Sequence, residues 1–314
     1  MRLILKSMAI IVILLISTAL SATAEFDVQG HRGCRGLMPE NTIAAFGYAL
    51  ELGVDTIELD TVITSDGVVV INHEPYLNTQ RTRKDGEFIK DRLLIKDLTF
   101  EELRKYDIGR TVNPEDWPEQ LQMDGQAILS LEEVLDLVRQ HNEKSAKEVR
   151  VNIEIKHFPE RPQDTVDLRE HVRKVLEVVS RFGFEELSTI QSFNWEAIKI
   201  SRELEPSVET VALISSTNLD KTIWTAGLRL RNFGFDIGKM LASIGCSVIS
   251  PNYTLMTEGW IESAHRYGLK IIPWTVNEVL EMERLIDLGV DGIITDYPDR
   301  LIELLSSRQK SLSH

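Results

Sequence analysis

The 314-residue chain predicts a closed (β/α)8 barrel, or TIM barrel, with a hairpin and a long loop inserted after the second strand. Strand patterns and helix patterns alternate strictly, which indicates a parallel sheet with helical crossovers. Eight such units in roughly 280 residues favour a closed barrel over an open doubly wound sheet. The open sheet is also disfavoured because no glycine-rich dinucleotide fingerprint follows the first strand.

Residues 1–24 have the pattern of a secretory signal peptide. Two basic residues precede an apolar stretch, and Ala22–Ala24 forms an A-x-A cleavage site. An uncleaved anchor is the alternative, but the apolar stretch is shorter than the roughly 20 residues that a membrane span needs. We therefore expect an exported protein, periplasmic or secreted, with one domain over residues 25–306, a polar tail over 307–314 and no membrane span after cleavage.

The first strand is expected at Asp27–Gly30 and the second at Thr56–Asp60. Between them, Thr42–Leu52 has the apolar spacing of a helix, with Asn41 as a candidate N-cap and Gly53 as its end. These elements form the first strand–helix–strand unit of the barrel.

A hairpin signal interrupts the alternation after the second strand. Val62–Ile71 carries Asp66-Gly67 at its turn. Residues 76–130 follow and are rich in charged and turn-forming residues, and the next long helix pattern begins only at Leu131. Connections of this length are usually functional, so we expect a lid or a binding loop.

The remaining units continue to the C-terminus. Strands are expected at Val151–Lys156, Thr189–Phe193, Thr210–Ile214, Ser247–Ser250, Lys270–Val276 and Gly292–Thr295. Helices are expected at Leu131–His141, Thr165–Phe182, Trp195–Leu204, Glu258–Tyr267, Glu278–Leu288 and Pro298–Ser306, with at least one more within residues 216–246.

Polar and aromatic residues stand near the ends of these strands. The site of such a barrel lies at the C-terminal ends of its strands, so residues far apart in sequence are expected to meet there. The polar and aromatic residues near these strand ends are His31, Arg32, Glu58, Asp60, Glu154, Lys156, Gln191, Phe193, Asn252, Trp274 and Asp296.

Three carboxylates among them predict a divalent cation. Glu58 and Asp60 are two residues apart on one strand and therefore share a face, where like charges repel and burial is costly. Glu154 adds a third carboxylate from the next strand of the barrel. Oxygen ligands favour Ca²⁺ or Mg²⁺ over Zn²⁺, which prefers nitrogen and sulfur.

Two histidines and two cations complete the predicted site. His31 and His73 suit proton transfer, one as acid and one as base. Arg32 and Lys156 suit a phosphate group. Singly, each of these features has an ordinary structural explanation, such as a salt bridge or a solvated strand end. Together they indicate metal-assisted phosphodiester cleavage.

Other residues carry weaker signals. Trp274 is either a packing residue or a wall of the substrate site, and Asp296 either reaches the rim or caps the last helix.

Cys34 and Cys246 are expected to be free thiols at opposite ends of the barrel. The formal net charge of −14 disfavours nucleic acid as a partner. Five further histidines are expected to be solvated: His141, His157, His171, His265 and His314.

At these residues the sequence resembles the glycerophosphodiester phosphodiesterase family, in particular its exported bacterial members. The matching motifs, in order between Gly30 and Asp299, are GHRG, PENT, GVDTIELD, SDGVVVINHE, VNIEIK, PWTVNE and GVDGIITDYPD.

The resemblance implies a TIM barrel that hydrolyses glycerophosphodiesters, such as glycerophosphocholine, to an alcohol and sn-glycerol 3-phosphate. It implies His31 and His73 as the acid/base pair and a divalent cation, often calcium. By the same resemblance the metal ligands are Glu58, Asp60 and Glu154, and the residues near the phosphate are Arg32 and Lys156.

Two positions depart from the family pattern. The aspartate that usually follows the second catalytic histidine is Glu74 here, which matters little if that acid orients His73 and more if it holds metal. The usual proline-threonine before the helix at Leu131 is replaced by Leu129-Ser130, a change expected to be local.

Two other functions are compatible with these residues. One is a phospholipase D-like or phosphoinositide-cleaving enzyme acting on intact lipid, which would need an exposed apolar rim; Phe88, Ile89 and Trp117 could supply it. The other is a phosphoester-binding protein without catalysis, which the presence of both His31 and His73 disfavours. The oligomeric state is left open.

Overall fold

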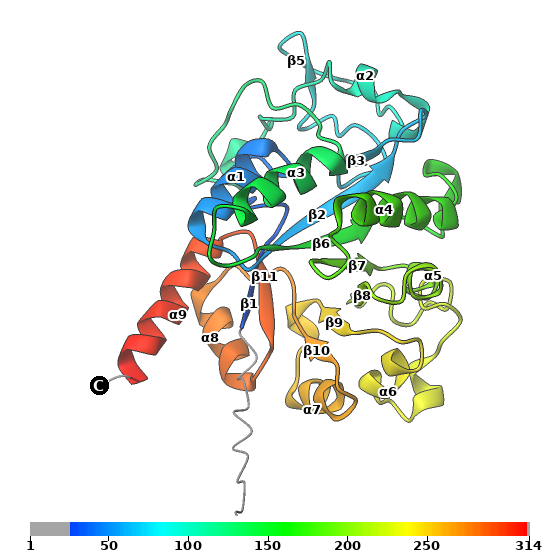
Figure 1. The fold of residues 1–314 in the computed structure, drawn as a ribbon, viewed down its shortest axis with the longest axis vertical. Helices are drawn as coiled ribbons and strands as arrows, with labels where there is room; N and C mark the ends of the chain where they lie inside the picture. Colours follow the sequence, from blue (N-terminus) through cyan, green and yellow to red (C-terminus); the bar gives the residue numbers. More distant parts are fainter. Residues whose placement is uncertain (1–25, 313–314) are drawn as a thin grey trace, which may run out of the picture.

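The structure, a computed structural model, describes residues 26–312 and shows a nearly closed barrel of parallel strands surrounded by helices (Figure 1). The signal peptide predicted for residues 1–24 lies outside this range. Neighbouring strands of the barrel follow the chain order, as the sequence predicted. They are β1 (Asp27–Gly30), β2 (Thr56–Ile63), β6 (Arg150–Ile155), β7 (Ser188–Ser192), β8 (Glu209–Ile214), β9 (Val248–Pro251), β10 (Lys270–Ile271) and β11 (Gly292–Thr295).

Helices connect these strands and pack around them (Figure 1). They are α1 (Ile43–Leu52), α3 (Leu131–Asn142), α4 (Leu168–Phe182), α5 (Glu196–Leu204), α6 (Ile237–Ala242), α7 (Glu258–Arg266), α8 (Val279–Leu288) and α9 (Pro298–Leu312). None of the helices in the described range combines the length and the apolar character that a membrane span requires.

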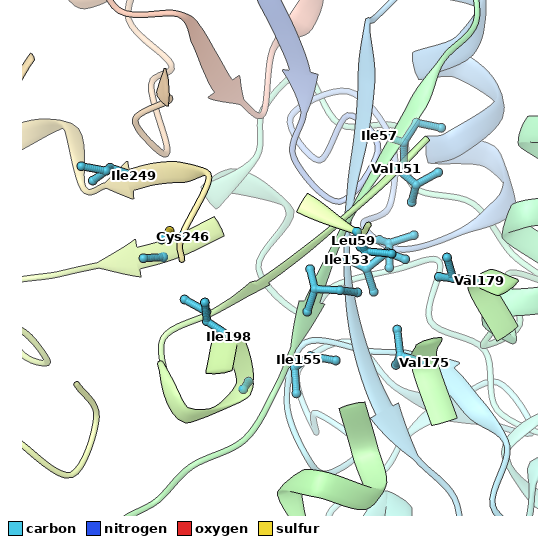
Figure 2. Packing of buried hydrophobic residues seen from close by; sticks show 14 of the residues in the cluster. Ile57, Leu59, Val151, Ile153, Ile155, Val175, Val179, Ile198, Cys246 and Ile249 are labelled. Atoms are coloured by element: carbon cyan, nitrogen blue, oxygen red, sulfur yellow. The ribbon is translucent and has the colours of Figure 1, made fainter. Parts of the chain in front are cut away.

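The core lies between the strands and the helices. Ile153 and Ile155 of β6 point towards Val175 and Val179 of α4, and all four side chains are buried (Figure 2). Because side chains alternate along a strand, this outward apolar set leaves Glu154 of the same strand facing the barrel interior. The same alternation in β2 turns its carboxylates inward.

The barrel closes between the seventh and eighth strands with few hydrogen bonds. Strand β10 is shorter than the predicted Lys270–Val276 because Pro273 has no N–H to donate to a neighbouring strand. The chain beyond it is still extended and joined to β11. Backbone N–H groups of Asp291, Ile294 and Val276 donate to carbonyls of Ile271, Pro273 and Ile294, each at 3.0 Å.

The inserted segment after β2 forms a small unit of its own. Strand β3 (Val69–Ile71) pairs antiparallel with β2, as the hairpin signal predicted, and β4 (Arg83–Lys84), β5 (Glu87–Phe88) and the short helix α2 (Phe100–Leu103) follow. The segment, coloured cyan at the top of Figure 1, lies beside β3. It shares a second apolar cluster with the hairpin, made of Val62, Val70, Leu77, Ile95, Leu103, Tyr106 and Ile128.

Several local predictions are corrected by the structure. Helix α1 is capped by Thr42, whose side chain accepts from the N–H of Ala45, and not by Asn41. Helix α9 continues beyond the predicted end at Ser306 to Leu312, since no glycine or proline stops it and Arg308 pairs with Asp287 of α8.

His171 is buried, which corrects the prediction that it is solvated. It lies on the inner face of α4 with no exposed surface, and its Nε2 lies 3.2 Å from Oγ1 of Thr61 on β2. Burial lowers the pKa of His171 to about 3, so the imidazole is neutral in the folded protein. The two cysteines, by contrast, are both buried and free, as predicted.

One sequence departure, Leu129-Ser130, is explained locally. Ser130 caps α3 in a reciprocal arrangement, since its hydroxyl accepts from the N–H of Glu133 and the Glu133 carboxylate accepts from the N–H of Ser130. The replacement of the family's proline-threonine by Leu129-Ser130 therefore preserves a helix start.

Candidate active site

Three carboxylates meet at the C-terminal end of the barrel. Strands β2 and β6 pair in a register that sets Asp60 beside Glu154, and Glu58 is two residues earlier on the same face as Asp60. One oxygen from each of Glu58, Asp60 and Glu154 lies within 4.8 Å of the other two. The side chains are buried, so the structure brings together the three residues that the sequence predicted as metal ligands.

Burial and mutual repulsion oppose ionisation of two carboxylates of the cluster, Glu58 and Glu154. Burial, together with the neighbouring Asp60 and Glu154, raises the pKa of Glu58 well above its usual range. Burial also raises the pKa of Glu154 to about 7, although Lys156 opposes the shift. A divalent cation would remove this repulsion, and an all-oxygen donor set suits Ca²⁺ or Mg²⁺. The residues present therefore fit the metal that the sequence predicted.

Two buried cations lie against these carboxylates. The Nζ atom of Lys156 is 2.8 Å from Oε1 of Glu154 and 3.6 Å from Oδ1 of Asp60. The Nε atom of Arg32 is 3.3 Å from Oδ2 of Asp60. Although burial raises the pKa of Asp60, Arg32 and other cations hold it well below its usual range. Asp60 is therefore the carboxylate whose ionised form is most strongly favoured.

His31 follows β1 and is oriented by the last strand. Strand β11 pairs with β1, so Asp296 directly follows the strand beside it. Nδ1 of His31 lies 2.6 Å from Oδ1 of Asp296, and Nε2 lies 4.0 Å from Oε2 of Glu58. A proton on Nδ1 that is donated to Asp296 leaves Nε2 able to accept a proton. Burial lowers the pKa of His31, although Asp296 opposes the shift.

His73 follows the hairpin and lies beside Glu74. Its Nδ1 is 3.3 Å from Oε1 of Glu74, and that carboxylate also accepts from Arg81 at 2.9 Å and from Asn78 at 3.2 Å. Burial, with Arg32 nearby, lowers the pKa of His73 to about 4. Glu74 is thus placed to orient His73 and is absent from the carboxylate cluster described above.

Glu40 connects the two halves of the site. Its carboxylate accepts from Nη1 of Arg32 at 2.8 Å and pairs with Arg35 at 2.8 Å. It also pairs with Arg81 of the inserted segment, the residue that holds Glu74. These cations lower the pKa of Glu40 against the effect of burial, so Glu40 is a fixed negative charge between the arginines.

A cavity of about 270 Å³ opens over these groups. Its walls include Trp274 and Phe193, whose rings meet edge to face with centroids 5.3 Å apart. Trp274 donates its indole N–H to the Ser250 carbonyl at 2.8 Å, which fixes the ring at the cavity. The polar residues that line it include His31, Arg32, Arg35, Glu58, His73, Glu154 and Gln191.

Three residues have roles that the sequence did not indicate clearly. Asp296 contacts His31 instead of capping α9, Gln191 donates to Oε1 of Glu58 at 2.6 Å, and Asn41 donates to Oδ2 of Asp60 at 2.9 Å. The sequence positions of Gln191 and Asp296 did indicate a place in the site, since each comes near the end of a barrel strand. Asn41 stands before a helix, where capping is the more common role.

A barrel that brings paired histidines, clustered carboxylates and buried cations to one end defines an α/β-barrel hydrolase suited to phosphoesters. A family model described as the glycerophosphoryl diester phosphodiesterase family matches residues 31–300. The glycerophosphodiester phosphodiesterase of Caldanaerobacter subterraneus subsp. tengcongensis is 32% identical over 278 residues, which cover 88% of this chain and 97% of that protein. The chain therefore belongs to the glycerophosphoryl diester phosphodiesterase family and is an enzyme of that type.

Solved structures agree with this fold. A crystal structure from Silicibacter pomeroyi DSS-3, with a provisional assignment as a glycerophosphoryl diester phosphodiesterase, is 31% identical with a TM-score of 0.81, covering 91% of this chain and 95% of that one. A phosphodiesterase from Oleispira antarctica, in complex with the product sn-glycerol-3-phosphate, shares the fold with a TM-score of 0.67 at 22% identity, covering 89% of this chain and 96% of that one.

Proposed function

We propose that this enzyme hydrolyses small glycerophosphodiesters, such as glycerophosphocholine and glycerophosphoethanolamine, to an alcohol and sn-glycerol 3-phosphate. His31 and His73 act as the acid/base pair. The observation that carries the proposal is that both imidazoles line one cavity together with two carboxylates of the predicted metal site. The product bound by the Oleispira antarctica phosphodiesterase supports the same reaction.

The phosphate is held by cations. Arg32 offers a planar guanidinium that can grip two phosphate oxygens, and Lys156 adds a compact charge beside it. Both are buried and already paired with carboxylates, which fixes their positions before the substrate arrives. Trp274 forms a wall against which the substrate packs.

Glu58, Asp60 and Glu154 would hold a divalent cation, Ca²⁺ or Mg²⁺, which would supply positive charge to offset the charge that develops on the non-bridging phosphate oxygens. Glu58 also fixes the neighbouring backbone, since its carboxylate accepts from the N–H of Arg32 at 2.9 Å.

The two histidines, His31 and His73, transfer the protons. One takes a proton from the nucleophile, either water or the glycerol hydroxyl of the substrate, and the other donates a proton to the oxygen of the departing alcohol as the P–O bond breaks. Asp296 supports His31 by accepting a hydrogen bond from its Nδ1–H. Glu74 supports His73, since its Oε1 lies 3.3 Å from Nδ1 of His73.

The test is turnover of glycerophosphocholine by the wild type and by His31→Ala and His73→Ala. Each variant should lose at least about 10²-fold in kcat, and chelation should abolish wild-type activity until Ca²⁺ or Mg²⁺ is restored. His265→Ala is the matched control, because its side chain is 45% exposed on α7. Near wild-type turnover in a His31 or His73 variant would remove that residue from the mechanism, and chelator-resistant activity would remove the metal.

Lysophosphatidylcholine, assayed in parallel, tests the lipid alternative. That alternative needs an exposed apolar rim, but Phe88, Ile89 and Trp117 are each half-buried. Ile89 packs against the second apolar cluster, and Trp117 lies under the guanidinium of Arg35 at 4.2 Å. We therefore expect faster turnover of glycerophosphocholine than of lysophosphatidylcholine.

We further propose that the enzyme is exported, as a periplasmic or secreted protein. The support is the signal-peptide pattern of residues 1–24. Cell fractionation with N-terminal sequencing tests it: a mature protein that starts at Glu25 is expected, and an intact N-terminus in the cytoplasm would contradict it.

A further inference from the structure

A second cavity of about 350 Å³ adjoins the active-site cavity. The two share Phe193 and Trp274, so this aromatic pair forms the boundary between them. We call the second cavity the outer cavity. It is also lined by Glu160, Ser215, Thr217, Asn218, Lys221 and Trp224. Nothing in the reaction described above uses these residues.

The outer cavity combines aromatic surface with a carboxylate. Trp224 is half-buried and meets Phe158 edge to face, with ring centroids 6.3 Å apart. Glu160 lies in the same wall and is 48% exposed. A carboxylate beside indole rings is the combination that binds ammonium groups, through charge attraction and cation–π contact.

An ammonium group already pairs with the carboxylate of Glu160. Nζ of Lys221 lies 2.8 Å from Oε1 of Glu160, and the Lys221 side chain is 51% exposed. Ion pairs this exposed contribute little to stability, so a different cation can replace Lys221 at small cost. Lys221 thus shows where a cation fits and also competes for the place.

We propose that the outer cavity binds the alcohol side of the phosphodiester and selects alcohols that carry an ammonium or quaternary ammonium group, with Glu160 and Trp224 as its recognition residues. This rests on the proposed function, because it assigns the leaving alcohol of that reaction to this cavity.

The charges of the two cavities match such a substrate. The inner cavity carries Arg32 on its wall, with Lys156 behind it, and receives the phosphate anion. The outer cavity offers Glu160 to a positive group on the far side of Phe193 and Trp274. A zwitterionic diester complements the charge of both cavities, with its phosphate in the inner cavity and its positive group in the outer one. A diester with a neutral alcohol complements only the charge of the inner cavity.

The experiment compares kcat/KM for glycerophosphocholine with kcat/KM for glycerophosphoglycerol, whose alcohol is neutral. The wild type should favour the choline ester. Glu160→Gln should reduce the ratio of the two values about two- to fivefold, in line with an exposed cation site. Lys221→Met should raise the same ratio, because it removes the competing ammonium.

The matched control is Glu203→Gln. Glu203 also pairs with a basic residue, Arg169, and is 61% exposed, but it lies on α5 outside both cavities. This variant should keep the wild-type ratio. Equal ratios in wild type and Glu160→Gln, or a fall in Lys221→Met, would overturn the inference while leaving the hydrolysis itself intact.

A binding measurement tests the cavity independently of turnover. Tetramethylammonium should quench tryptophan fluorescence of the wild type, more strongly in Lys221→Met and less in Glu160→Gln. The same titration of Trp224→Phe should lose most of the signal. Equal quenching in wild type and Glu160→Gln would overturn the cation site. Cation binding in a protein that turns over no glycerophosphodiester would instead refute the proposed function and, with it, the assignment of the cavity to a leaving alcohol.

Discussion

Nδ1 of His31 lies 2.6 Å from Oδ1 of Asp296, although 265 positions separate the two residues. The barrel itself creates this contact, because His31 follows the first strand and Asp296 follows the last, and these strands pair. Asn277 holds the other oxygen of Asp296 by donating to it at 2.8 Å. The carboxylate is therefore fixed from two sides.

Replacing Asp296 with asparagine should slow the enzyme strongly. The amide has nearly the same shape but can present an N–H to Nδ1 of His31, which favours the wrong tautomer. We expect kcat for glycerophosphocholine to fall by on the order of 10²-fold or more, with an unchanged circular dichroism spectrum. Asp287→Asn, at an exposed ion pair on α8, is the control. A loss in Asp296→Asn of less than about threefold would leave the contact without a role in turnover.

Calcium should stabilise the folded protein through Glu58, Asp60 and Glu154. A cation at about 100 times its dissociation constant adds about 2.7 kcal/mol to the free energy of unfolding and raises Tm by several degrees. Glu154→Gln should lose most of that rise. Glu209→Gln is the control, because Glu209 begins a barrel strand at the opposite end and pairs with Arg150. The readout is the calcium-dependent shift of Tm, and an equal shift in Glu154→Gln would exclude Glu154 as a ligand.

His171 should make the protein less stable in acid. Its pKa is about 3 in the folded protein and close to 6.5 when unfolded, so only the unfolded chain gains a proton as the pH falls between these values. The free energy of unfolding should decrease by on the order of 3 kcal/mol between about pH 6.5 and pH 4 from this residue alone.

Urea unfolding across that pH range measures the effect. His171→Gln keeps a donor for Thr61 but does not titrate, so its stability should change less with pH than that of the wild type. His265→Gln, at an exposed position, should retain the wild-type slope. Parallel pH profiles for the wild type and His171→Gln would show that His171 does not cause the loss.

Asn41 should matter for stability through both its backbone and its side chain. Its φ of 58° lies in the left-handed region, and its side chain donates to Asp60. Asn41→Ala loses the buried hydrogen bond and adds backbone strain, for a cost of about 2–4 kcal/mol. Asn41→Gly loses only the bond and should be about 1 kcal/mol more stable than Asn41→Ala. Urea unfolding of both variants checks the order, and a glycine variant no more stable than the alanine one would contradict the backbone contribution.

The sequence was sufficient to predict the barrel and where its polar residues meet. Strict alternation indicated the parallel strands, and the two-residue spacing of Glu58 and Asp60 placed both on the inner face. The register of β2 and β6 then sets Asp60 beside Glu154, which the common position of both at strand ends had indicated. These predictions succeeded because they depend on backbone periodicity alone.

The remaining contacts depend on tertiary packing that periodicity does not encode. His171 directly follows two charged residues, Arg169 and Glu170, yet the turn of α4 places it inward against Thr61. Thr42 caps α1, so the side chain of Asn41 is not used as a cap and binds Asp60 instead. Arg81 reaches the site only because the inserted segment folds back towards it.

The site thus depends on two structural elements that can loosen separately. The orientation of His31 relies on the pairing of β1 with β11, and that of His73 relies on Glu74, which Arg81 of the inserted segment holds. Partial opening at either place would separate the proton donor from the proton acceptor while most of the barrel stayed folded. Catalysis is therefore expected to fail at lower denaturant concentrations than the loss of helical signal.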